Sequence, residues 1–228
     1  MATVSAFIAA ILASGEVKNS GNTNTTAALR RSLVRALSRL SSVRAAFTED
    51  DFELTTVVDQ ADYTTADSGF PIAAIDFEVV EFDSGSGVYQ ELEHVDLPRL
   101  RGELRRSGSL LSPGKPRMFA WWGGELMLAP APATAATLRG WYHRDARRDE
   151  VTGNLIDTTS ASDAYTNPWF SDGEDPLWNK VLEIYHLAFA VDAERASFYA
   201  GQADAAVRAL GLEWTRRGRP GFQTAQHW

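Results

Sequence analysis

Residues 116–129, Pro-Arg-Met-Phe-Ala-Trp-Trp-Gly-Gly-Glu-Leu-Met-Leu-Ala, decide the fold class of this 228-residue chain. Two apolar runs flank Gly123-Gly124, and two glycines supply the positive φ that a tight hairpin turn needs. We therefore predict a β-hairpin at this point. Apolar and polar residues also alternate in several segments of residues 52–142, which favours strands. The middle of the chain is thus predicted to form a small antiparallel sheet.

Local signals refine this sheet. The alternation slips phase at Val79-Val80, which predicts a β-bulge. The turn-forming residues 83–87 should connect that strand to a returning strand. Asp96-Leu-Pro98 has the residues that cap and start a helix, so we expect a short helix to about residue 106.

Helical spacing appears on both sides of the sheet. Residues 1–15 carry an apolar ridge and no charge, so we expect a short helix that another surface covers; a cleaved signal peptide is the alternative. A second helix should begin with Asn24 or Thr25 as its N-cap. Asp175-Pro176 predicts the start of a long, buried helix. That helix should end near Gly201, and a further helix should follow.

These patterns predict an α+β protein, described as a mostly helical bundle with a small antiparallel β-sheet inserted in the middle. The N-terminal helices lie within residues 1–48 and the β-rich insertion within 49–143. A polar loop and the C-terminal helices of the helical core occupy 144–217, and residues 218–228 form an extended tail.

Composition excludes several classes of protein. The chain has no cysteine, which removes disulfide scaffolds, thiol catalysis and thiolate metal sites. No run of about 18 apolar residues occurs, so we expect no contact with a membrane interior. The net charge of −8 argues against DNA binding by the whole surface. Residues 49–96 carry fourteen acidic residues and no lysine or arginine, whereas residues 1–48 are mainly basic. Such blocks suit complementary surfaces between subunits, although they equally suit ordinary solvated faces.

No constellation of residues indicates catalysis. The four histidines lack the spacing of a zinc-binding helix, and neither a nucleophile elbow nor a phosphate-binding loop occurs. His143 is expected to be exposed at a strand end, and His186 to pack within the long helix. Consecutive acids in Glu49-Asp-Asp51 should point apart. We therefore predict that the chain is not an enzyme and has no catalytic, cofactor-binding or metal-binding residues.

Several short motifs follow one another in a familiar order. They are Gln60-Ala-Asp-Tyr63, a proline ahead of a strand at Pro71, Gly114-Lys-Pro-Arg-Met-Phe119, Leu126-Met-Leu-Ala-Pro-Ala-Pro132 and Leu138-Arg-Gly-Trp-Tyr142. With helices before and after, over about residues 24–215, this order resembles the head–tail connector (adaptor) proteins of tailed bacteriophages, which dock on the portal ring.

The resemblance implies a structural virion protein of the phage neck that is assembled in the host cytoplasm. Members form a ring, usually of twelve copies, that contacts the portal protein and downstream tail or neck proteins. DNA passes through the lumen without sequence-specific binding. The long loop at 145–175 departs from the family pattern and leaves the position within the neck open. No cofactor is implied.

The C-terminal tail offers candidate partner-binding residues, namely Arg219, Phe222, His227 and Trp228. An extended peptide with aromatic ends can dock on a partner, but a frayed terminus without a role is equally compatible. Two other functions stay open. One is a different neck or tail component, of the head-completion or tail-terminator type. The other is a soluble ligand-binding module that uses Trp121, Trp122 and Trp141 as a platform.

Overall fold

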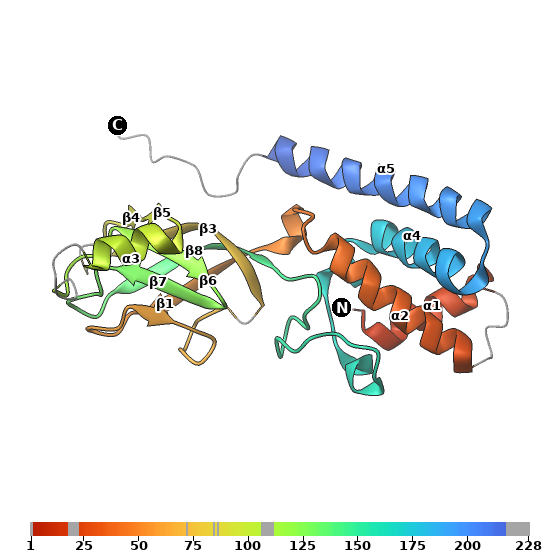
Figure 1. Cartoon of the computed structure of the whole chain (residues 1–228), viewed down its shortest axis with the longest axis horizontal. Coiled ribbons are helices and arrows are strands. Elements are labelled where there is room, and N and C mark those ends of the chain that lie inside the picture. The colour runs from red at the N-terminus through yellow and green to blue at the C-terminus, as the bar shows by residue number, and fades with distance from the viewer. Residues whose placement is uncertain are drawn as a thin grey trace. The chain divides into compact units, whose positions relative to one another are not determined.

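The computed structural model describes residues 2–17, 23–71, 73–83, 85, 87–105 and 112–217. Over these residues the chain is α+β, with five α-helices and two four-stranded sheets whose strands are spread over residues 49–144 (Figure 1). The prediction of a mostly helical bundle with one small inserted sheet is therefore wrong. It failed because the second sheet includes two-residue strands, which are too short to show a period in the sequence.

The chain forms two compact units. The helical unit is built from both ends of the chain, up to Thr48 and from Asp145 onwards. The β unit is the continuous segment Glu49–Arg144. The α-helices of the helical unit are α1 (Val4–Ala13), α2 (Thr23–Leu40), α4 (Glu174–Tyr185) and α5 (Ala193–Arg217).

The helical unit has its own hydrophobic core. The ridge of α1 is buried there, as its lack of charge predicted, and α4 packs against both α2 and α5 (Figure 1). The core includes Phe7, Ile11, Leu29, Leu33, Leu37, Trp169, Leu177, Val181 and Tyr199. No helix in the described part of the chain is long and apolar enough to cross a membrane.

Two of the predicted helix boundaries need correction. α2 already includes Thr23, so Asn24 and Thr25 are not its N-cap. Gly201 lies inside α5 and does not break it. The break comes earlier, where the π-helix His186–Ala190 is followed by Val191 in the left-handed conformation, with φ of 52°. Asp192 then starts α5, because its carboxylate accepts a hydrogen bond from the Arg195 amide at 3.1 Å.

The segment between the β unit and α4 folds onto the helical unit through short 3₁₀ turns, Ser160–Ala164 and Pro168–Phe170. The Asn167 side chain donates to the carbonyls of Ala146 and Arg148, at 3.1 and 2.7 Å. The segment is therefore ordered by its own hydrogen bonds. A third 3₁₀ turn, Ala46–Thr48, ends the first part of the unit.

The first sheet of the β unit has the order β1 (Glu49–Thr55), β8 (Thr137–Arg144), β3 (Ala74–Asp83) and β4 (Gln90–Glu91). The second has the order β2 (Asp62–Tyr63), β7 (Glu125–Ala129), β6 (Met118–Trp122) and β5 (Glu93–His94). All neighbours are antiparallel except β5 and β6, which are parallel. The hairpin predicted at Gly123-Gly124 is confirmed as β6–β7. The predicted bulge lies between Phe77 and Val79, one residue from its expected place.

The second sheet is covered on both faces, which explains the continuous apolar run of β7. Phe119, Leu126 and Leu128 share a core with residues of the first sheet, such as Phe52 and Leu138. The alternate residues pack instead against α3 (Leu97–Arg105), and this cluster contains Leu100, Ala120, Met127 and Ala129. As predicted, Asp96 caps α3 by accepting from the Arg99 amide at 3.0 Å.

Candidate functional site

Two groups of polar residues lie where the chain enters and leaves the β unit. Glu49, the first residue of β1, is paired in register with His143, the last but one residue of β8. Neighbouring residues in a strand point to opposite faces of the sheet. The ends of these strands therefore carry one polar group on each face.

One face carries Asp50, Tyr142 and Arg144. The Asp50 carboxylate accepts a hydrogen bond from the Tyr142 hydroxyl at 2.9 Å and forms an ion pair with the Arg144 guanidinium. Burial, with the adjacent Asp50 carboxylate, raises the pKa of Tyr142 to about 12. Tyr142 therefore stays a neutral donor at physiological pH, and the group acts as a cross-strand clamp.

The other face carries Glu49, Glu78 and His143. The Nε2 atom of His143 lies 3.9 Å from Oε1 of Glu49 and 4.0 Å from Oε2 of Glu78. Glu78 comes from β3, at the bulge between Phe77 and Val79 and two residues after Asp76, which is paired with His143. His143 is 3% exposed, so its predicted exposure is wrong. Two strands, one on each side of β8, bring carboxylates to it and help to bury it.

These three residues offer one imidazole nitrogen and two carboxylate oxygens, all within 4.8 Å of one another. Histidine and carboxylates together are ligands of divalent metal ions. No metal-binding residue was predicted from the sequence, so this group was not anticipated. Its members are far apart in the sequence, and only the strand register places them together. The phase slip that predicted the bulge was the one available signal.

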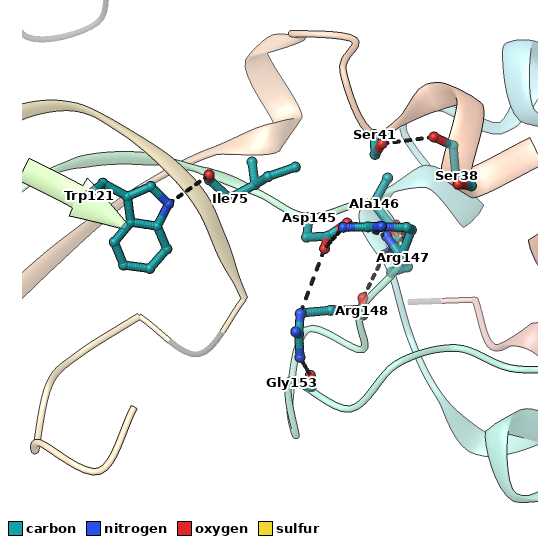
Figure 2. Close-up of polar contacts among 10 residues, drawn as sticks. Ser38, Ser41, Ile75, Trp121, Asp145, Ala146, Arg147, Arg148 and Gly153 are labelled. Atoms are coloured by element: carbon teal, nitrogen blue, oxygen red, sulfur yellow. Dashed lines mark hydrogen bonds and ion pairs between the residues drawn. The ribbon is translucent and has the colours of Figure 1, made fainter. Parts of the chain in front are cut away.

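Acids in Glu49-Asp-Asp51 point apart, as predicted: Glu49 and Asp50 take part in the two separate groups. A third carboxylate with fixed partners, that of Asp145, directly follows the end of β8. Asp145 accepts two hydrogen bonds from the Arg147 guanidinium, at 2.9 and 2.8 Å. Arg148 lies between Asp145 and the Gly153 carbonyl, to which it donates at 2.7 Å (Figure 2).

The predicted tryptophan platform is only partly assembled. Trp121 and Trp122 line a hollow of about 370 Å³ together with residues 94–98. Trp121 is held by packing on Phe77 and by its indole nitrogen, which donates to the Ile75 carbonyl at 2.9 Å (Figure 2). Trp122 is 62% exposed. Trp141 belongs to the other sheet and is not among the residues that line the hollow.

The four partner-binding candidates in the tail, Arg219, Phe222, His227 and Trp228, lie outside the described residues. His186 is buried in the π-helix and stacks on Tyr199 with ring centroids 5.5 Å apart, which confirms its packing role. Burial, followed by the charge of Arg195, lowers the pKa of His186 below its ordinary value.

Comparison of the chain with models of protein families and with curated proteins finds no match.

Proposed function

We propose that this chain is a structural protein of the phage neck. In this proposal, copies form a ring, of about twelve by the resemblance described above, that joins the portal to the tail and continues the DNA channel. The observation that carries the proposal is that three of the motif segments, within residues 60–63, 114–119 and 126–132, are joined by backbone hydrogen bonds in the β unit. The motifs thus have a common structural role, which favours the resemblance over a chance series of turns.

The backbone contacts are direct. The Gly114 amide donates to the Ala131 carbonyl at 2.8 Å, and the Ala133 amide donates back to the Gly114 carbonyl at 3.0 Å. These bonds join the Gly-x-Pro segment to the Pro-x-Pro segment. The Gln60–Tyr63 motif also joins the last of these segments, because the Leu128 amide donates to the Ala61 carbonyl at 2.8 Å.

The side chains of the motifs hold turns and strands. The Tyr63 hydroxyl is 3.0 Å from the Gln60 carbonyl and 3.2 Å from the Val57 amide. The side-chain amide of Gln60 donates to the Asp67 carboxylate at 2.9 Å. Gly140 lies where β8 passes so close to β3 that a Cβ atom would be 2.1 Å from the Val79 carbonyl oxygen. Motif residues with such roles suit a structural protein.

A closed ring requires that each copy bury surface against its neighbours through two different patches. The helical unit exposes apolar side chains around the end of the π-helix and the start of α5, namely Leu187, Val191 and Phe198. We infer that a second copy covers this surface, which we call the α5 patch. Phe198 is the largest of the three side chains and is 60% exposed.

The test uses the full chain in its native producer cells. Lysates are sedimented on a gradient and the fractions probed for the chain. We expect co-migration with phage-sized particles at a fixed number of copies per particle. A chain that stays entirely at low mass while particles sediment away contradicts the proposal. The ligand-binding module around Trp121 and Trp122 then becomes the leading hypothesis.

A matched pair of variants tests the α5 patch separately. Phe198→Asp is expected to abolish ring assembly, measured as mass in light scattering, without changing the circular dichroism spectrum. Val151→Asp introduces the same charge at an apolar residue that is 69% exposed in another part of the helical unit. This control is expected to assemble normally. Normal assembly of Phe198→Asp would exclude the α5 patch as the interface while leaving the neck proposal to the sedimentation test.

A further inference from the structure

We propose that Glu49, Glu78 and His143 bind a divalent metal ion, for which Zn²⁺ is the best probe. The group lies on three adjacent strands, β1, β3 and β8, and each strand contributes one ligand. The inference is independent of the proposed neck function, because it rests only on the geometry of these three side chains.

The separations suit a small ion after a slight contraction. Zinc binds histidine nitrogen and carboxylate oxygen at about 2.0–2.2 Å, so tetrahedral ligands lie about 3.4 Å apart. The two measured separations from Nε2 are 3.9 and 4.0 Å. Each carboxylate therefore has to move towards Nε2 by roughly half an ångström, and the two carboxylate oxygens, which lie within 4.8 Å of each other, also have to approach; side-chain torsions of a glutamate allow both movements. The histidine can stay where the sheet holds it.

The donor set also decides the class of ion. One imidazole and two carboxylates suit Zn²⁺ and other first-row divalent ions better than Ca²⁺, which prefers six to eight oxygen ligands. Three protein ligands leave one tetrahedral position for water. The ion thus cross-links the three strands where the chain enters and leaves the β unit, on the opposite face of the sheet from the clamp formed by Asp50, Tyr142 and Arg144.

A competing explanation is that a protonated His143 forms ion pairs with both carboxylates without any metal. The two explanations differ in one measurable quantity, the binding of one ion per chain. They also differ in their response to substitution. A metal site loses affinity when one ligand oxygen becomes an amide nitrogen, whereas an ion pair has no metal affinity to lose.

The experiment starts from the full chain after dialysis against a chelator. Isothermal titration calorimetry with ZnCl₂ is expected to show one ion per chain, and CoCl₂ is expected to give the visible absorption of a four-coordinate site. Glu78→Gln preserves volume and should weaken Zn²⁺ binding at least tenfold. Glu53→Gln is the matched control: it makes the same change on an exposed residue of β1 and should leave affinity unchanged.

Glu49→Gln provides a second ligand variant with the same expected loss, in case Glu78→Gln disturbs the bulge. Circular dichroism of each variant confirms that it is folded before titration. The proposal is overturned if the chain binds no stoichiometric Zn²⁺. It is equally overturned if folded Glu49→Gln and Glu78→Gln bind as tightly as the unaltered chain, because the ion would then be bound elsewhere.

Discussion

Replacing Gly140 by alanine should lower the free energy of unfolding of the β unit by more than most substitutions that add a single methyl group. An added Cβ atom would lie 2.1 Å from the Val79 carbonyl oxygen and 2.9 Å from Cε1 of Phe52. Real Cβ atoms essentially never approach a heavy atom closer than 3.0 Å. The obstacle is the backbone of the adjacent strand, so no side-chain rotation can relieve it. β8 and β3 therefore have to separate by about 0.9 Å at this point.

The magnitude follows from that separation. Adjacent strands are about 4.7–4.9 Å apart, and their hydrogen bonds are already about 2.9 Å long, so an extra 0.9 Å takes the two flanking bonds beyond hydrogen-bond distance. Two such bonds contribute about 2–3 kcal/mol, and overpacking against Phe52 adds about 1–3 kcal/mol. We expect Gly140→Ala to lower the free energy of unfolding of the β unit by about 3–6 kcal/mol.

The matched control is Gly102→Ala, the same change in α3 of the same unit. Nothing lies within 4 Å of its added Cβ. Alanine is favoured over glycine inside a helix, so this variant should be more stable by about 0.5–1 kcal/mol. Urea unfolding, monitored by amide hydrogen exchange in β3 and β8, measures the free energy of unfolding of the β unit for both variants. A Gly140→Ala protein within 1 kcal/mol of the unaltered chain would refute the reasoning.

Three further predictions concern other parts of the chain. Burial, followed by the charge of Arg195, lowers the pKa of His186 in the folded protein below the value of about 6.5 in the unfolded chain. The unfolding free energy should therefore be highest above about pH 6.5 and should decrease as the pH falls below that value, because the unfolded chain then binds a proton more readily. Unfolding free energies measured between pH 8 and 5 should show this decline, and His186→Phe should flatten it; an unchanged slope contradicts the assignment. Tyr63→Phe leaves the Gln60 carbonyl without its hydroxyl donor and should cost about 1–2 kcal/mol in urea unfolding, whereas a neutral effect would mean that water replaces the hydroxyl. Deletion of residues 218–228 should leave the unfolding free energy unchanged and reduce incorporation into particles, and normal infectious yield from the truncated chain would show that the tail is dispensable.

Local features of the fold were predictable because neighbouring residues determine them. Gly123-Gly124 supplies the positive φ of the β6–β7 turn, with values of 63° and 91°, and Asp96 caps α3. Gly201 misled the prediction because a glycine costs a helix only about 1 kcal/mol, which the packing of α5 outweighs. The actual break had a signal in Asp192, an acid that starts a helix, but the long apolar pattern before it concealed the boundary.

The candidate site was not predictable in the same way, because it depends on strand register. Glu49 and Glu78 meet at His143 only when β1 and β3 flank β8, and the chain order gives no indication that they do. The register of β3 adds a further condition, since a one-residue slip of β3 against β8 would turn Glu78 to the opposite face. A one-residue error in either pairing removes the group altogether. Secondary structure alone therefore does not identify it.

Whether or not a metal binds, the candidate site lies at the ends of β1 and β8, where the chain connects the two units. Both covalent connections between the two units leave from the same end of one strand pair, at Glu49 of β1 and at Arg144 of β8, which follows the partner of Glu49, His143. The carboxylates of Glu49 and Asp50 contact β8 from opposite faces at this point, so both faces of the pair are held by side chains as well as by the backbone. Fraying of the pair would release both connections at once. The contact between Glu49 and His143, at 3.9 Å, is longer than the hydrogen bond between Asp50 and Tyr142, at 2.9 Å. A divalent ion would strengthen the contact between Glu49 and His143, because it would form a coordinate bond with each of the two side chains. Metal-dependent protection from hydrogen exchange should therefore be greatest at the amides nearest Glu49 and His143 and should decline along β1 towards Thr55.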